Sequence, residues 1–252
     1  MQRGGVSLKY SFISEKAGRE VNEDRVGVKS ADGRVCLVVC DGLGGHGMGD
    51  RASEIVVRSF CDISEDNIPV NEFHRMAFAL AAENMFKAAA EDSSLAGMKT
   101  TAVAFYAAGK ECCWSHIGDS RLYAFRNNEI AAVTKDHSVP QMLVDSGAIT
   151  PDEIRSHPDR NKILRAVGTN GIMPDFEVSF TADMSNYDAF LLCTDGFWSH
   201  IDEKKMCRLL KNSSDADSWL RHMAKIVKRN GEGKKADNYS AIAFINKGKG
   251  VN

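Results

Sequence analysis

Residues 100–133 read TTAVAFYAAGKECCWSHIGDSRLYAFRNNEIAAV, and this stretch decides the class of fold. Its apolar and aromatic runs are broken by small or polar residues at 108–110, 118–119 and 127–128. Short apolar runs joined by such tight turns are typical of antiparallel strands. Parallel strands would need a helical crossover between them, so the stretch predicts an antiparallel sheet.

Helix and strand patterns surround this stretch. Apolar residues at helical spacing occur in two pairs of segments, which are 50–60 and 70–91, then 202–211 and 215–229. Strand-like runs occur in four further segments, which are 34–40, 175–180, 188–193 and 238–246. Asp50 is expected to cap the first helix, and Gly231 to end the last one. The order predicts an α+β fold with one helix pair for each face of a β layer.

The segment 138–172 differs from the rest of the chain. It holds three of the five prolines, and Thr150 followed by Pro151 and Glu153 is a helix-start signature. We expect a small, mostly helical insertion within a single domain that spans residues 1–252.

Composition excludes several classes of protein. The formal net charge is −2, with 43% hydrophobic and 26% charged residues, which is ordinary for a globular protein. The sequence gives no sign of the clustered basic face that nucleic-acid-binding proteins usually have, so no nucleic-acid partner is expected. No apolar run is long enough for a signal peptide or a membrane span, so we expect a cytoplasmic protein that does not contact a membrane. The seven cysteines are expected to be reduced thiols.

A glycine-rich loop follows the predicted strand 34–40. GLGGHG, residues 42–47, matches a dinucleotide-binding pattern, and Asp62 lies about where that pattern needs an acid. However, Asp41 directly precedes the first glycine and would repel a pyrophosphate, and no parallel β-α-β unit surrounds the loop. A single Asp-Gly pair is most often only a turn. A metal held by Asp41 is the better functional interpretation.

Further acidic residues stand beside predicted strands. They are Glu23, Asp24, Asp119, Asp195 and Asp237. Carboxylates gathered at one rim of a sheet would repel each other unless cations neutralised them. Mg²⁺ and Mn²⁺ prefer such oxygen ligands, so the pattern favours a divalent metal site.

Six ordered motifs carry a resemblance to a known family. They are REVNED (19–24), VCDGLGGHGMGDRAS (39–53), IGDSRLY (117–123), TKDHS (134–138), CTDGFW (193–198) and ADNYSAI (236–242). Together they resemble the metal-dependent serine/threonine protein phosphatases of type 2C, the PPM family, in its bacterial branch. The resemblance implies a four-layer α-β-β-α sandwich, with two antiparallel sheets between helix pairs and 138–172 as a flap beside the active site.

The resemblance also implies roles for individual residues. Asp41 would bridge two ions, and Gly42 would offer its backbone carbonyl. Asp195, Asp237 and Glu23 would complete the ligands, and Asp119 matches a third metal position. Arg19 would bind the substrate phosphate, while Asp24 and Asn238 would support the ligands from behind. Asp41, Asp195, Asp237 and Arg19 are thus the implied catalytic residues.

The implied activity is hydrolysis of phosphoserine and phosphothreonine in proteins. Two Mn²⁺ or Mg²⁺ ions would lower the pKa of a water molecule, which then attacks phosphorus. The expected partners are phosphorylated proteins, with a serine/threonine kinase as the counterpart that adds the phosphate.

Two positions depart from the family pattern. Leu43 stands where many eukaryotic members carry a histidine thought to act as general acid, and His46 lies three residues further on. The proton donor is therefore unassigned. Ser199 stands where several members carry an acidic ligand, so a third ion is expected to bind weakly. His116 and His137 are interpreted as structural histidines.

Alternative functions stay open at this stage. The chain could be an inactive module that binds phosphoproteins or a kinase, although retention of three aspartates argues against it. It could also hydrolyse small phosphate esters, because the phosphate-cleaving core would be the same. A narrow phosphatase for one regulatory protein is a third possibility.

Overall fold

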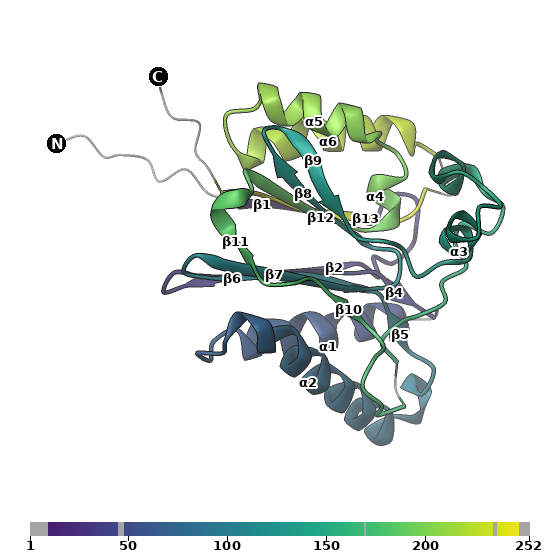
Figure 1. Ribbon diagram of the computed structural model, residues 1–252. Helices are drawn as coiled ribbons and strands as arrows, with labels where there is room; N and C mark the ends of the chain where they lie inside the picture. The colour runs from purple at the N-terminus through teal and green to yellow at the C-terminus, as the bar shows by residue number, and fades with distance from the viewer. Residues whose placement is uncertain (1–9, 45–47, 169, 234–235, 247–252) are drawn as a thin grey trace.

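The computed structural model describes residues 10–44, 48–168, 170–233 and 236–246 of the 252-residue chain. Two antiparallel sheets pack face to face, and helices cover the outer face of each (Figure 1). The first sheet contains, in spatial order, β1 (Tyr10–Glu15), β13 (Tyr239–Ile245), β12 (Ala189–Cys193), β8 (Arg121–Arg126) and β9 (Glu129–Val133). Strand β13, the last strand in the described part of the chain, is thus an interior strand between β1 and β12.

The second sheet carries most of the N-terminal strands. In spatial order it contains β10 (Glu177–Val178), β7 (Glu111–Ile117), β6 (Ala102–Ala108), β3 (Arg34–Cys40) and β2 (Arg25–Ala31). Strand β11 (Ala182–Asp183) also pairs with β7, and a separate ribbon joins β4 (Gly42–Leu43) to β5 (Lys99–Thr100).

The stretch 100–133 forms β6 to β9, all antiparallel as predicted. Its middle turn is not a hairpin, because the chain crosses there from the second sheet to the first. Gly118 makes this crossing with φ of 97°, a conformation that favours glycine, and a Cβ there would lie 2.5 Å from the Thr101 side chain.

Helix pairs cover the two sheets in the predicted order. Helices α1 (Met48–Ile63) and α2 (Val70–Glu91) pack on the second sheet, while α5 (Glu203–Asn212) and α6 (Ala216–Asn230) pack on the first (Figure 1). Between the sheets lies a fully buried apolar layer that includes Leu37, Phe105 and Phe190. The predicted α+β sandwich with four layers is confirmed.

Some helix ends differ from expectation. Asp50 was predicted to cap α1, but the helix begins at Met48 and Asp50 lies within its first turn. Gly231 follows α6 as predicted, and its N–H donates to the Val227 carbonyl. A carboxylate in the first turn still interacts favourably with the positive end of the helix dipole. Asp50 therefore marks the start of the helix, although it lies inside the helix and not at the cap position.

The insertion lies at one end of the sandwich, beside α4 (Asp195–Trp198) (Figure 1). It contains α3 (Val139–Asp145) and the 3₁₀ helix η2 (Pro151–Ser156), so its helical content is as expected. The Thr150 backbone N–H donates to the Glu153 carboxylate over 2.7 Å, which completes the predicted helix start. Two further 3₁₀ turns are η1 (Ser93–Leu95) and η3 (Met184–Asn186).

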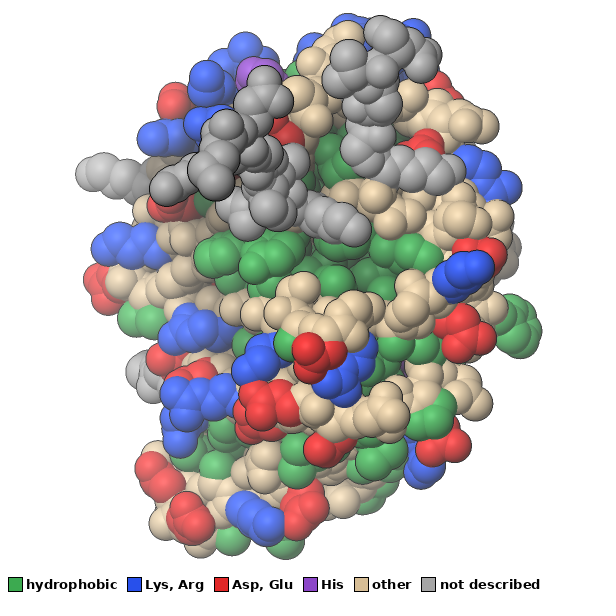
Figure 2. Space-filling view, turned by 90° about the vertical axis from the view of Figure 1, so that its left-hand side faces the viewer, with side chains coloured by type: hydrophobic (Ala, Val, Ile, Leu, Met, Phe, Trp, Pro, Cys, Tyr) green, Lys and Arg blue, Asp and Glu red, His purple; other side chains and the backbone are tan. Residues whose placement is uncertain are grey.

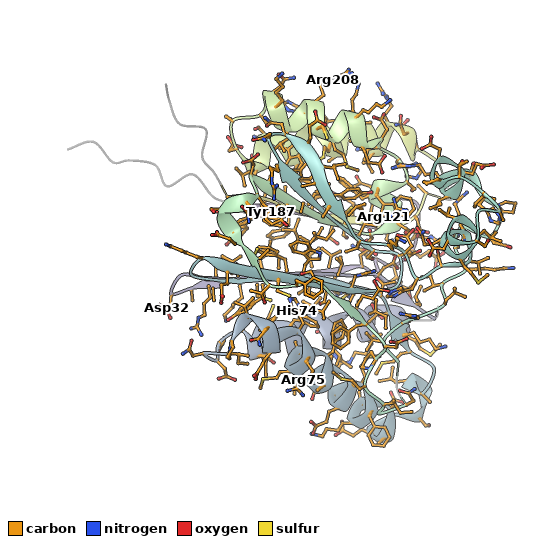
Figure 3. All side chains as sticks on the ribbon, in the orientation of Figure 1. Asp32, His74, Arg75, Arg121, Tyr187 and Arg208 are labelled. Carbon is orange, nitrogen blue, oxygen red and sulfur yellow. The ribbon has the colours of Figure 1, made fainter. Side chains whose placement is uncertain are left out.

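The predicted strand at 175–180 is mostly absent. Only Glu177–Val178 pair with β7, and Phe180 lies 96% exposed. Figure 2 shows the end of the sandwich opposite the insertion, where apolar side chains form a band between two charged zones. In Figure 3, Tyr187 lies toward that end and Arg121 toward the insertion. No helix among the described residues is long and apolar enough to cross a membrane.

Candidate active site

The predicted acidic residues meet at the end of the sandwich that carries α4. Asp41 directly follows β3, Asp195 begins α4, and Asp237 lies just before β13. Burial raises the pKa of Asp41 well above its usual range, and neighbouring carboxylates add to the rise; these are Asp24, Asp195, Asp119 and Asp237. Five carboxylates distant in the sequence therefore interact in one place.

Asp24 lies behind this group and contacts the chain next to Asp195. The Thr194 hydroxyl donates a hydrogen bond of 3.0 Å to Asp24, which is almost fully buried. Burial first, and then the charges of Asp195 and Asp237, together raise the pKa of Asp24 to about 7. The carboxyl group therefore supports the loop that carries Asp195 without facing solvent.

Asn238 connects an N-terminal segment of the chain to the C-terminal strand β13 at the site. Its Oδ1 accepts a hydrogen bond of 2.9 Å from the Glu23 backbone N–H. Its Nδ2 donates to the carbonyls of Lys16 and Val21, each over 3.0 Å. One amide side chain thus fixes the backbone around Glu23 against the start of β13.

Close backbone approaches explain three glycines in the motifs. A Cβ on Gly42 would lie 2.1 Å from the Gly49 carbonyl oxygen, and one on Gly196 would lie 2.0 Å from the Asn238 oxygen. A Cβ on Gly49 would lie 2.7 Å from Glu23 Oε1. Any side chain at these positions would push the acidic segments apart, so the glycines are needed for packing rather than for binding pyrophosphate.

The carboxylates are short of positive partners. Burial and the Asp237 charge together raise the pKa of Asp195 to about 6. Burial and the Asp195 charge also raise the pKa of Asp119. Asp24 Oδ1 and Asp119 Oδ1 are buried and accept no hydrogen bond from any described residue. Acceptor-rich, electron-rich oxygens held together in this way fit hard divalent cations.

Arg19 supplies one nearby positive charge. Its Nη2 donates a hydrogen bond of 2.8 Å to Asp237 Oδ2, and both side chains are partly open to solvent. This ion pair raises the pKa of Arg19 further above its ordinary value. A pocket of about 640 Å³ opens here, and its lining includes Arg19, Asp195 and Asp237.

The amino-acid sequence matches the family model described as Protein phosphatase 2C over residues 14–238. This chain belongs to the protein phosphatase 2C family. The resemblance expected from the six motifs is confirmed.

Characterised family members show the extent of the likeness. The serine/threonine protein phosphatase PstP of Mycobacterium tuberculosis is 33% identical over 221 residues, covering 86% of this chain and 42% of PstP. The serine/threonine phosphatase stp of Listeria welshimeri is 33% identical over 214 residues, covering 80% of this chain and 84% of that one. The chain therefore spans about two fifths of the length of PstP and most of the length of stp.

Solved structures of the family share the fold. Stp1 from Staphylococcus aureus matches with a TM-score of 0.85 at 27% identity, covering 98% of each chain. The catalytic domain of PstP, described in complex with two manganese ions, matches with a TM-score of 0.78 at 26% identity. That match covers 94% of this chain and 98% of the PstP domain.

Two positions that depart from the family pattern lie at the site. Leu43 belongs to β4 and offers no proton, and His46 lies outside the described residues. Ser199 directly follows α4 and lines the pocket beside Arg19 and Asp195, so no carboxylate stands there to join Asp119. Arg160 and Asn161 from the insertion also line the pocket. Sequence reasoning did not single them out, because only the folded insertion brings them to Asp195.

A group of His116, His137 and Glu177 has ligand atoms within 4.8 Å of one another. It fits a metal poorly. The Gly118 N–H donates to His137 Nδ1 over 3.2 Å, so Nε2 keeps the proton and faces Glu177. The two rings stack 4.6 Å apart, so their in-plane lone pairs run side by side instead of converging. This geometry favours the structural role expected for both histidines.

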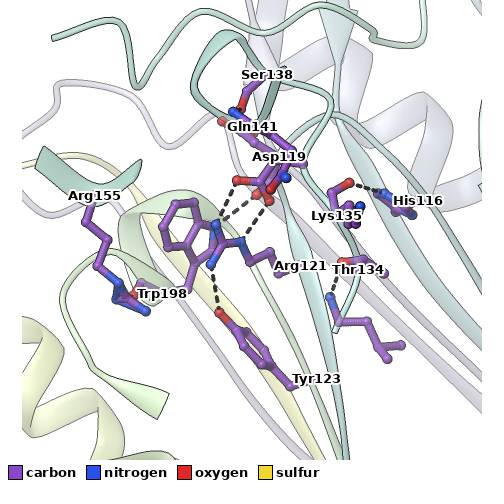
Figure 4. A network of polar contacts seen from close by, with 12 residues as sticks. His116, Asp119, Arg121, Tyr123, Thr134, Lys135, Ser138, Gln141, Arg155 and Trp198 are labelled. Atoms are coloured by element: carbon purple, nitrogen blue, oxygen red, sulfur yellow. Dashed lines mark hydrogen bonds and ion pairs between the residues drawn. The ribbon is translucent and has the colours of Figure 1, made fainter. Parts of the chain in front are cut away.

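A buried network of polar contacts adjoins the site at Asp119 and α4 (Figure 4). Arg121 makes two hydrogen bonds of 2.8 Å to the Asp136 carboxylate, and its guanidinium stacks 3.5 Å from the Trp198 ring centre. Trp198 Nε1 donates to the Asp119 carbonyl over 2.9 Å, and Arg155 of the insertion donates to the Trp198 carbonyl over 2.7 Å. The network therefore joins the insertion, α4 and the turn that carries Asp119.

Proposed function

We propose that the chain is a metal-dependent phosphatase that hydrolyses phosphoserine and phosphothreonine in proteins. The observation that carries this proposal is the convergence of Asp41, Asp195 and Asp237 beside Arg19 at an open pocket, with raised carboxyl pKa values for Asp41 and Asp195. Membership of the protein phosphatase 2C family and relatives named serine/threonine phosphatases support it.

Two Mn²⁺ or Mg²⁺ ions fit the arrangement of acidic oxygens. Asp41 would contact both ions, and the Gly42 carbonyl, Glu23, Asp195 and Asp237 would supply the other protein ligands. When bound, such ions neutralise the carboxylates and lower the pKa of a coordinated water to near neutrality. The PstP catalytic domain described with two manganese ions supports this number. Asp119 would hold a third ion weakly, because Ser199 replaces a carboxylate.

Chain residues would orient the substrate and the ligands. Arg19 would donate from its guanidinium to two phosphoryl oxygens, which requires that it exchange its present hydrogen bond with Asp237. Asp24 would hold the loop of Asp195 through Thr194. Asn238 would hold Glu23 in register with the start of β13. Arg19, Asp24 and Asn238 therefore act by binding and positioning.

The natural substrates would be phosphorylated proteins in the cytoplasm, and a serine/threonine kinase would be the counterpart enzyme. An inactive phosphoprotein-binding module would need no set of closely spaced carboxylates. The alternative of small phosphate esters uses the same acidic site, so only relative turnover separates it from the protein phosphatase.

The test is phosphate release from a phosphothreonine peptide. The purified protein is assayed without metal, with Mn²⁺ and with Mg²⁺, alongside Asp41→Ala. Asp62→Ala is the matched control, because Asp62 is exposed and would have a role only in a dinucleotide-binding site. We expect metal-dependent release that Asp41→Ala abolishes and Asp62→Ala retains. A folded protein that releases no phosphate with any metal contradicts the proposal, and faster turnover of nucleotides than of peptide favours small esters.

A further inference from the structure

A second hollow adjoins the catalytic pocket. It has a volume of about 610 Å³ and lies among β1, α6 and the segment before β13. Gly196, His200 and Asp237 line both this hollow and the catalytic pocket. A molecule that occupies the catalytic pocket can therefore continue into the second hollow, which we name the side groove.

The floor of the side groove is apolar. Ile13 from β1, Tyr239 from β13, and Ala224 and Val227 from α6 line it. Ala224, Val227 and Tyr239 are each less than a tenth exposed, so they form a firm surface beneath the opening. An apolar side chain placed here would lose contact with water and gain contact with all three elements.

The rim of the side groove is mainly basic. Arg221, Lys225 and Lys228 follow one another along the exposed side of α6, and Lys16 stands on the β1 side. Arg221 pairs with Asp217 at 2.6 Å, whereas Lys225 and Lys228 form no ion pair with any described residue. The acidic lining residues are Glu15, Glu232 and, where the hollow meets the catalytic pocket, Asp237. The unpaired lysines give the α6 side a local excess of positive charge.

The dimensions of the rim suit a short extended peptide. The seven steps along α6 from Arg221 to Lys228 rise about 10 Å. Three residues of extended chain cover about the same distance, at roughly 3.3 Å each. Acidic side chains spaced along such a peptide would meet the basic stripe while an apolar neighbour reached the floor.

We propose that the side groove binds the polypeptide segment next to the phosphorylated residue and selects substrates with an apolar residue followed by acidic residues on that side. The inference rests on the proposed phosphatase function. Its support is the continuity of the two pockets, the apolar floor and the unpaired charges of Lys225 and Lys228. A nucleic acid would match the charge but leave the apolar floor without a partner.

Kinetics with matched phosphothreonine peptides test this selection. One peptide has neutral flanks, and two carry an apolar residue followed by acidic residues either before or after the phosphothreonine. We expect kcat/KM about 3- to 10-fold higher for one flanked peptide than for the neutral one, because each exposed charge pair contributes little. Equal kcat/KM for all three peptides overturns the proposal.

A pair of charge-reversed proteins locates the effect. Lys225→Glu with Lys228→Glu should abolish the preference for the flanked peptide and leave turnover of a small aryl phosphate unchanged. Lys204→Glu with Arg208→Glu is the control: it changes the net charge equally on α5, whose exposed Arg208 is labelled in Figure 3. A preference that survives in the first variant, or disappears equally in both, contradicts the side groove.

Peptide binding to the metal-free protein separates this inference from the proposed function. Fluorescence polarisation of the labelled flanked peptide measures docking without turnover. Tighter binding to the natural protein than to the Lys225→Glu, Lys228→Glu variant supports the groove even where no phosphate is released. Phosphate release with no difference in binding or kcat/KM leaves the phosphatase standing and overturns the groove.

Discussion

Two polar regions lie at the same end of this molecule and differ in how their charges are satisfied. In the first region, the Arg121 network, Arg121 holds both oxygens of Asp136, and Trp198 covers the guanidinium. In the second region, the acidic site, Asp41 and Asp195 face other carboxylates, and their pKa values are raised. The charges of the Arg121 network are paired within the chain, whereas the acidic site would need added cations to neutralise it.

This difference separates a structural role from a chemical one. A buried charge with good partners holds elements together, and removing one partner exposes the other to an apolar environment. Buried charges that lack partners destabilise the fold, so their presence indicates a ligand. The two regions should therefore respond in opposite directions to substitution.

The largest effect on activity is expected for Asp41→Asn. Loss of the shared ligand should remove measurable phosphatase turnover, well beyond the roughly 10- to 100-fold typical of residues that only orient a ligand. The metal-free variant should melt at the same or a higher temperature, because one of the mutually repelling carboxylates is gone. Calorimetry and phosphate release measure both quantities, and a strongly lowered Tm would place Asp41 with the structural region instead.

Arg121→Leu should have the opposite profile. It leaves Asp136 buried and unpaired, which costs about 3–5 kcal/mol of folding free energy. Urea unfolding of the variant measures the loss. Arg126→Leu is a matched control, because Arg126 is exposed at the far end of the same strand. A loss of folding free energy below about 1 kcal/mol, the size expected for exposed ion pairs, would show that the Arg121 network does not stabilise the fold.

Acidity should stabilise the metal-free protein over a defined range. The pKa is raised to about 7 for Asp24 and to about 6 for Asp195, from an ordinary value of 3.8. Between pH 3.8 and about 7 the folded state therefore binds more protons than the unfolded state. The free energy of unfolding falls as pH rises through this range. The Tm measured without metal should increase as pH is lowered from 7.5 to 5.5. Saturating Mn²⁺ should flatten or reverse this trend, and a metal-independent profile would contradict the acidic site.

The smallest effect is expected for Trp198→Phe. The variant keeps an aromatic ring but loses the hydrogen bond to the Asp119 carbonyl, which contributes about 1 kcal/mol. Activity at saturating metal should change only a few-fold, since no proposed ligand is removed. Trp219→Phe is a control of similar chemistry, because Trp219 Nε1 also donates to a backbone carbonyl but lies under α5. A large loss of activity in Trp198→Phe alone would show that the two regions are coupled.

The regular elements were the easiest part of the fold to predict from the sequence. The helix expected at 70–91 is Val70–Glu91, because a long run of good helix formers leaves no alternative. The strand expected at 175–180 shortened to two residues, since pairing with β7 depends on a neighbouring edge that periodicity does not contain. The Asp195-Gly196 pair, interpreted alone as a turn, begins α4 because the backbone at Asn238 packs against Gly196.

The acidic residues of the candidate site could be predicted because each belongs to a short sequence motif. The motifs identified Asp41, Asp195 and Asp237, and the structure brings them together. The pairing of Arg121 with Asp136 was not foreseen, although both residues belong to quoted motifs, because a pairing between two strand ends depends on register. Arg160 was also missed. It lines the same pocket as Asp195 only because of the way the insertion folds back.

The interior position of β13 in the first sheet has a consequence for biosynthesis. This strand lies between β1 and β12, and it follows Asp237, whose partner Arg19 is 218 residues earlier. Ribosomes add about 5–20 residues per second, so roughly 10–40 s separate the synthesis of these two side chains. Throughout that interval the nascent chain has an incomplete first sheet, and Arg19 has no Asp237 to pair with. The acidic site can therefore form only after β13 has been inserted between β1 and β12.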